Sequence, residues 1–292
     1  MELRKRTYSV SFCKRTVKMK NGFKVTDISQ WVEGQMIRGH YMFTKKDVLD
    51  LGLSIKEASV NKSLQRLEAR GVIVSPWQNF YVSVPTEYKL RGIVPPSFYF
   101  DSLMKFLGRD YYVSHLTSAS LNGASHQVAM VFQAVVTGGP IRSGVKNESR
   151  LEFTMRQNLP VAFIRQVKTQ SGYMNVAGAE LTALDMVADY KKVGGLSRAA
   201  EILVELCEQT KWDDSRLSLL GYFSVATVQR LGYLLDLIGE HGQADALFAL
   251  MKCMGKTARK IPLKQSLPVS DDMPMDGRWK VVVNYDLEID EI

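Results

Sequence analysis

The stretch 54–84 constrains the fold more than any other part of the chain. It begins with a predicted capping box, in which Ser54 and Glu57 satisfy each other's backbone amides, and the helix that follows ends at Gly71. A β-hairpin is predicted directly after it over 72–84, where two short apolar runs flank a turn. A helix followed at once by a hairpin is the arrangement of a recognition helix and wing in a winged helix-turn-helix.

Two further helices are predicted before this one. The first covers 26–39, where apolar residues recur at helical spacing. The second begins at Thr44, its expected N-cap, with Asp47 three residues on. Only Gly52 and Leu53 separate it from the predicted cap of the third, which is the short turn of a helix-turn-helix.

The third helix is predicted to divide into two faces. Val60, Leu64 and Leu67 form its apolar stripe. The other side carries short polar and cationic side chains that can reach base edges or phosphates from a major groove. The predicted DNA-binding residues are Lys45, Lys46, Lys56, Ser59, Lys62, Gln65, Arg66 and Arg70.

The charge of the chain is concentrated in its first third. Residues 1–91 hold 17 Lys and Arg against 8 Asp and Glu, whereas the remainder holds 21 against 22. A local basic excess favours binding to a phosphate polyanion, because neutralised phosphates release condensed counterions. The alternative is a winged helix used only for protein contacts. The basic extension 1–25 is interpreted either as an arm that touches DNA phosphates or as a disordered start.

A larger domain over 97–292 is predicted to follow an ordered, proline-containing linker at 85–96. The apolar run 128–136 predicts a central strand buried on both faces. Other predicted strands cover 151–156, 161–168, 173–176 and 279–285, and predicted helices cover 97–107, 111–122 (capped by Asp110), 180–190, 197–208, 224–238 and 245–254. The expected fold class is mixed α+β: a winged helix-turn-helix at 26–84, then a domain with a mixed sheet covered by helices.

No catalytic constellation stands out in the sequence. The four histidines lack zinc-binding spacing, the three cysteines are far apart, and no phosphate loop or nucleophile elbow is present. We therefore expect no catalytic residues, no metal and no cofactor. The rival hypothesis is a nuclease-like effector assembled from Glu152, Glu180 and Lys168, which nothing in their spacing selects.

Several strings of residues resemble the AbiEi family of antitoxins from type IV abortive-infection toxin–antitoxin systems. They run in order from YMFTKKDV and LQRLEARGVIVSPWQNFYVSVP, through EYKLRGIVPPSFYFDSLMKFLGRDYYVSHLTSASLNGASHQVAMVFQ, to SGYMNVAGAELTALDMV, VQRLGYLLDLIG and WKVVVNYDLEID. The resemblance covers about 26–290. It implies a protein that represses its own operon by binding promoter inverted repeats and counteracts an AbiEii-type nucleotidyltransferase toxin. A plain winged-helix regulator without a toxin partner is the alternative.

The chain departs from the family pattern in its predicted wing, which has no cation at its tip. Trp77 in that turn is expected to pack on the recognition helix or on a sugar. His115 and His126 are expected to be hydrogen-bonded core or helix-end residues, and Arg230 to pair with a buried carboxylate.

A second basic cluster is predicted near the C-terminus as a secondary DNA or partner contact. Its members are Lys252, Lys256, Arg259, Lys260 and Lys264. The sequence has no apolar run of roughly 18 residues and no secretory signal, so we expect a cytoplasmic, bacterial protein with no membrane contact that joins the nucleoid when bound to DNA.

Overall fold

The computed structural model describes residues 27–53, 56–124, 130–146 and 149–288. The N-terminal module, 27–84, contains three helices around one small core, which includes Ile28, Trp31 and Leu64. The predicted helices and hairpin are present, and a short additional strand joins the hairpin in an antiparallel sheet of order β1-β3-β2. The elements are α1 (Ile28–Ile37), β1 (Met42–Thr44), α2 (Lys45–Leu49), α3 (Glu57–Ala69), β2 (Ile73–Trp77) and β3 (Phe80–Ser83).

The ends of these helices test the predicted caps. Thr44 caps α2 as expected: its side chain accepts a hydrogen bond from the backbone amide of Asp47, and the side chain of Asp47 accepts one from the backbone amide of Thr44. Gly71, at φ +66°, ends α3 in the left-handed conformation that glycine adopts without a steric cost. The predicted start of α3 at Ser54 was wrong: Lys56 is its N-cap and Glu57 its first helical residue. Ser54 lies outside the described residues.

A six-stranded mixed sheet forms the centre of the larger domain, with strand order β6-β7-β5-β4-β9-β8. The pairs β5–β7 and β4–β9 are parallel, and the other three pairs are antiparallel. Its strands are β4 (Tyr111–Val113), β5 (Val131–Val136), β6 (Gly144–Lys146), β7 (Ser149–Met155), β8 (Ile164–Thr169) and β9 (Gly172–Ala177). This arrangement confirms the predicted mixed α+β class.

Alternating side chains of the sheet enter two different cores. Tyr111 and Val113 of β4 face α4, whereas Tyr112 between them faces α5 and α6. This alternation follows from the two-residue period of a strand, and it is why the central strands are apolar on both faces. The helices are α4 (Pro96–Phe106), α5 (His115–Leu121), α6 (Ala179–Ala188), α7 (Leu196–Leu206), α8 (Leu217–Leu220), α9 (Val225–Leu237) and α10 (His241–Cys253).

The secondary structure predicted for residues 111–122 was wrong. The predicted helix 111–122 is strand β4 followed by α5, whose N-cap is Ser114 and not Asp110. Residues 111–113 are aromatic or β-branched and therefore favour a buried strand. The residues after them have helical spacing, and the prediction extended that helix too far toward the N-terminus. Helix α10 also begins four residues before the predicted Asp245.

A C-terminal segment lies over α9 and α10. Its strands β10 (Ile261–Pro262) and β11 (Val281–Val282) form a short parallel pair, so the predicted strand 279–285 is reduced to two residues. Trp279 is fully buried, and its indole nitrogen donates to Asp236 at 2.7 Å. The ring fills the space beside Gly232 of α9, where a Cβ atom would lie 2.1 Å from it.

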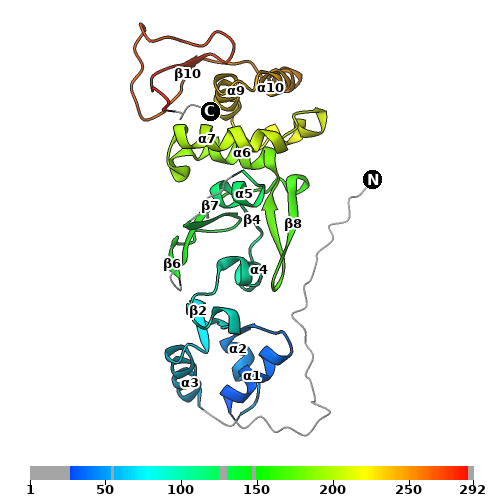
Figure 1. Ribbon diagram of the computed structural model, residues 1–292, viewed down its shortest axis with the longest axis vertical. Helices are drawn as coiled ribbons and strands as arrows, with labels where there is room; N and C mark the ends of the chain where they lie inside the picture. The colour runs from blue at the N-terminus through cyan, green and yellow to red at the C-terminus, as the bar shows by residue number, and fades with distance from the viewer. Residues whose placement is uncertain (1–26, 54–55, 125–129, 147–148, 289–292) are drawn as a thin grey trace.

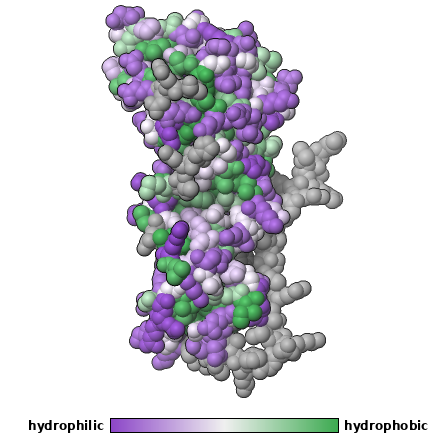
Figure 2. All heavy atoms as spheres, in the orientation of Figure 1, coloured by the Kyte–Doolittle hydropathy of each residue, from purple (hydrophilic) through white to green (hydrophobic). Residues whose placement is uncertain are grey.

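The elements are arranged along one long axis (Figure 1). The helices α1–α3 lie at one end, the sheet in the middle, and the C-terminal segment at the other end. The space-filling view shows hydrophilic side chains at both ends, interrupted by small hydrophobic patches (Figure 2). No helix among the described residues is long and apolar enough to cross a membrane.

Candidate functional site

The exposed face of α3 carries the side chains predicted from the sequence. Val60, Leu64 and Leu67 are buried against α1 and α2, and they fix which side of the helix faces outward. The opposite face is exposed to solvent along its length. It presents Ser59, Lys62, Gln65, Arg66 and Arg70.

The lysines around α2 are held differently from one another. Lys45 forms an ion pair with Glu57, Nζ to Oε1 at 2.6 Å, and its side chain is largely buried. The hydrogen bond and charge of Lys45 lower the pKa of the Glu57 carboxyl below its ordinary value. Lys46 and Lys56 are exposed. Lys45 therefore ties α2 to the start of α3, and only the other two have free access to a ligand such as a phosphate.

The hairpin packs against the larger sheet near its turn. Its turn is Gln78 and Asn79, the latter at φ +62°, which asparagine tolerates better than most residues. Trp77 packs edge to face on Phe153 of β7, with ring centroids 6.5 Å apart. The expectation that Trp77 packs on the recognition helix was therefore wrong, because the hairpin is also part of the core beneath the larger sheet.

Most of the basic excess lies outside the described module. Of the 17 basic residues in 1–91, eight fall within 1–26, where there is a single acidic residue. Residues 27–91 hold nine basic and seven acidic side chains. The predicted basic extension, 1–25, lies outside the described residues. The charge of the helical module alone is therefore small, and its cations matter by position more than by number.

The C-terminal basic cluster sits at the opposite end of the long axis from α3 (Figure 1). Three of its members have partners within the domain. Lys252 lies over the ring of Phe248, and Lys264 lies over the ring of Tyr285. Lys260 contacts Asp271 at 3.5 Å, and the two other members are Lys256 and Arg259.

Beside the sheet, a network of charged groups is buried. Arg156, just after β7, contacts Asp185 of α6, Nη2 to Oδ1 at 2.7 Å, and Asp189 at 3.8 Å. The hydroxyl of Tyr112 also donates to Asp185, at 3.3 Å. His115 contacts Asp189 at 3.2 Å. The network ties the end of β7 and the start of α5 to one helix, α6.

The two aspartates of this network respond oppositely to their surroundings. Asp185 is fully buried, and burial raises the pKa of its carboxyl despite the charge of Arg156. Burial also opposes ionisation of Asp189, but the hydrogen bond and charge of His115, with Arg156 and Lys192, outweigh it and lower its pKa. His115 is buried and hydrogen-bonded, as predicted; it adopts φ +52°, an uncommon conformation for a residue with a side chain. His126 lies outside the described residues.

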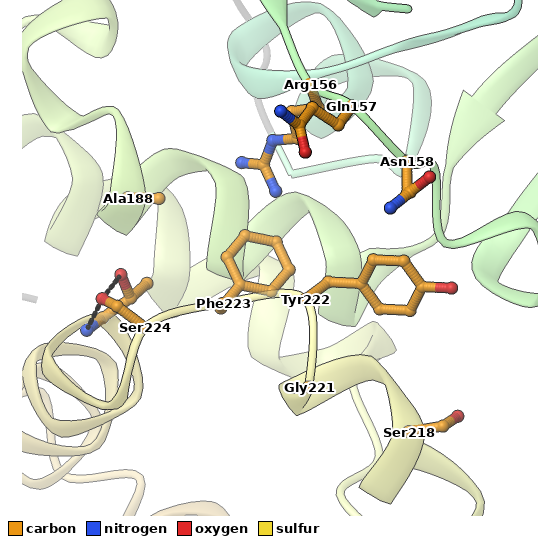
Figure 3. A pocket seen from close by; sticks show the side chains of 10 residues that line it. Arg156, Gln157, Asn158, Ala188, Ser218, Gly221, Tyr222, Phe223 and Ser224 are labelled. Carbon is orange, nitrogen blue, oxygen red and sulfur yellow. Dashed lines mark hydrogen bonds between the residues drawn. The ribbon is translucent and has the colours of Figure 1, made fainter.

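An open cavity of about 750 Å³ adjoins this network (Figure 3). Arg156, Gln157 and Asn158 line one side, and Tyr222 and Phe223 line the facing side. The guanidinium of Arg156 lies 4.5 Å from the centre of the Phe223 ring. Ala188, Ser218, Gly221, Ser224 and Thr227 complete the lining.

The residues of the rival nuclease hypothesis are not brought together. Glu152 accepts a hydrogen bond from Gln133, and Glu180 pairs with Arg216 at 3.1 Å. Lys168 is exposed on the edge strand β8. Within the described ranges, no group of three or more His, Cys, Asp and Glu side chains is placed to hold a metal ion.

The predicted ion pair of Arg230 was wrong. Arg230 of α9 has no carboxylate partner among the described residues; it donates to the carbonyl oxygens of Pro262 and Leu263, at 2.9 and 3.0 Å. The neighbouring Gln229 donates to the carbonyl of Arg259. These two side chains satisfy the backbone of the C-terminal segment, and thus hold it on α9.

The region of similarity to a known family comprises the sheet and the helices α5 to α9. Residues 112–237, from β4 to the end of α9, match the model of the AbiEi antitoxin C-terminal domain. This part of the chain is similar to the AbiEi antitoxin C-terminal domain. The resemblance found in the sequence is confirmed over these residues, and the match supports an antitoxin role in a toxin–antitoxin system. The buried charge network and the cavity both lie inside this AbiEi domain.

The wider fold also has a solved counterpart. The crystal structure of the RV2827C protein from Mycobacterium tuberculosis matches with a TM-score of 0.61, over 87% of this chain and 90% of that one. The two sequences are 16% identical, so the similarity concerns the fold alone. No curated protein matches the chain.

Sequence reasoning missed the cavity and the network beside it. Arg156, Asp185 and Tyr222 are far apart in the chain and belong to no motif of fixed spacing. The one available signal was a pair of acidic residues four positions apart, Asp185 on α6 and Asp189 at its C-cap, a spacing that places two residues on one side of a helix.

Proposed function

We propose that this antitoxin belongs to a type IV system, represses its own operon through a winged helix-turn-helix at 26–84, and counteracts an AbiEii-type nucleotidyltransferase toxin. The observation that carries the DNA-binding part is the exposed face of α3, where Lys62, Gln65 and Arg66 project from a helix whose opposite stripe is buried. Amide and guanidinium groups in this position can read base edges in a major groove, and cations at its margin can contact phosphates.

The partners in this proposal are promoter DNA with inverted repeats and the cognate toxin. Lys46 and Lys56 flank the start of α3 and Arg70 its end, so the three would contact the DNA backbone on either side of the bases. Lys45 is assigned a lesser role, because a phosphate contact would have to replace its ion pair with Glu57.

The DNA-binding part is tested by gel-shift titration on the chain's own promoter. The double variant Lys62→Ala, Arg66→Ala should bind at least about tenfold more weakly, since one bidentate base contact contributes about 1–3 kcal/mol. The matched control is Lys168→Ala, another exposed cation, on the edge strand β8 of the larger sheet. Unchanged affinity of the double variant would exclude α3 as the recognition helix.

The antitoxin part is tested with the same full-length variants. Deleting the N-terminal module is unsuitable, because Phe80 and Val82 of its hairpin belong to the core under the larger sheet. Cells that express the toxin from a separate, unregulated promoter should still be rescued by the double variant. Rescue would show that neutralisation resides outside the α3 face, whereas loss of rescue with a folded variant would show that DNA binding is required.

The C-terminal basic cluster is assigned to a partner and not to the same operator. It lies at the far end of the molecule from α3, so one straight duplex crossing α3 would not reach it (Figure 1). An acidic surface on the toxin is the chemistry that suits Lys256 and Arg259. Charge reversal of these two should impair rescue from the toxin and leave the promoter gel shift unchanged.

A further inference from the structure

The cavity between the end of β7 and the start of α9 has the chemistry of a binding site. Its volume, about 750 Å³, lies within the range typical of small-ligand sites. One wall is the segment 156–158, which leaves the sheet after β7, and the facing wall is the loop between α8 and α9 (Figure 3). Both walls are built on rigid elements, because Arg156 is anchored to α6 through Asp185 and Ser224 caps α9.

The charge of the cavity argues against a ligand that is bound mainly through an anionic group. Arg156 is the one charged side chain in the lining. Its guanidinium contacts Asp185 at 2.7 Å and Asp189 at 3.8 Å, so two carboxylates already compensate it. A phosphate or carboxylate placed here would meet that negative charge as well as the cation. The site therefore suits a ligand whose bound part is uncharged.

The remaining lining pairs hydrogen-bonding amides with aromatic rings. Gln157 and Asn158 are exposed, and each offers both a donor and an acceptor. Opposite them, Tyr222 is 46% exposed, whereas Phe223 is buried beneath Arg156. Figure 3 shows the amide of Asn158 directed toward the side on which the Tyr222 ring lies. A planar group could stack on that ring and present its edge to both amides.

We propose that this cavity binds a single nucleobase, which stacks on Tyr222 and is held at its edge by Asn158 and Gln157. A nucleobase is planar and uncharged and carries donors and acceptors on one edge, and proteins commonly hold unpaired bases by aromatic stacking and side-chain amides. The base comes either from a free nucleoside or nucleotide or from an unpaired stretch of nucleic acid. Its sugar and any phosphates would project through the open side of the cavity.

The test is ligand-observed NMR and calorimetry on the full chain. The probes are adenosine, guanosine, cytidine and uridine, their monophosphates, and short single-stranded oligonucleotides. Tyr222→Ala should weaken binding at least about tenfold, as expected when one base-stacking contact is lost, whereas Tyr222→Phe should retain it. Asn158→Ala should weaken it and change the preference among the four bases.

The matched control is Tyr173→Ala, which removes a tyrosine of similar exposure from β9, outside the cavity lining. Nucleoside binding that depends on Tyr222 but not on Tyr173 would support the proposal with a free nucleoside or nucleotide as the source. Binding of oligonucleotides alone, with the same dependence, would support it with nucleic acid as the source. The proposal is overturned if no probe binds up to its solubility limit, or if Tyr222→Ala binds every probe as the unaltered chain does.

Discussion

Trp77 of the N-terminal hairpin and Phe153 of the central sheet lie edge to face, with ring centroids 6.5 Å apart and ring planes at 86°. They belong to one core that also contains Phe80 and Val82 of the hairpin and the buried face of α4. The module that carries α3 is therefore not a separate domain attached only through a linker. Because both parts bury side chains in the same core, we expect them to unfold together.

Replacing Trp77 by alanine should expose this shared core. The indole is half-buried, so we expect a loss of about 2 kcal/mol in the free energy of unfolding, below the range for a fully buried tryptophan. Urea denaturation followed by circular dichroism measures it. Gln78→Ala, in the exposed turn beside it, should change stability by less than about 0.5 kcal/mol. Two separate unfolding transitions in the unaltered chain would contradict the shared core.

Gly232→Ala should be strongly destabilising although alanine favours helices. The added Cβ would lie 2.1 Å from the Trp279 ring, which must move out of its buried position. Overpacking of this kind costs about 1–3 kcal/mol or more and exceeds the helix-propensity gain of about 1 kcal/mol. A fall in the thermal midpoint, with increased protease sensitivity after residue 255, is the expected result.

The control for this substitution is Gly242→Ala in the neighbouring helix α10. Nothing lies within 4 Å of the Cβ it would add, so only the propensity gain applies there. We expect Gly242→Ala to leave stability unchanged or to raise it by up to about 1 kcal/mol. Equal effects of the two substitutions would show that Trp279 does not occupy the space beside Gly232.

Asp189 should make stability depend on acid pH. Burial alone would raise its pKa, but His115, Arg156 and Lys192 outweigh burial, and the folded pKa lies below the ordinary value. A carboxyl with a lowered folded pKa adds stability above its unfolded pKa, near 4, and that stability is lost as the pH falls through the folded value. Asp189→Asn should therefore flatten the fall in unfolding free energy below about pH 4. Identical pH profiles would contradict this ion pairing.

Removing residues 1–26 should reduce the salt dependence of promoter binding. This segment contains eight of the 17 basic residues in 1–91. If several of them neutralise phosphates, each one lost reduces the slope of log affinity against log salt by about 0.9. Gel shifts at several salt concentrations measure the slope. An unchanged slope would show that the extension makes no phosphate contacts and that the cations near α3 supply the whole electrostatic contribution.

Sequence patterns predicted those parts of the fold that local interactions control. The stripe of Val60, Leu64 and Leu67, the Thr44 cap and the left-handed Gly71 were all correct, because each depends on residues within one or two helical turns. The errors arose where distant contacts compete with local preference. Tyr112 lies in a strand because it is sandwiched between β5 and β9.

The exposed face of α3 was determined by the sequence alone, because a helix with one buried stripe must turn its other residues outward. Only the tertiary structure decided that Trp77 packs on Phe153, that Arg230 holds a backbone segment, and that Arg156 meets Asp185 beside a cavity. These contacts join residues more than 25 positions apart, and no periodicity records which distant side chains will meet. The strings that resemble the AbiEi family identified the domain, whereas the packing of α6 on the sheet determined which side chains meet in its interior.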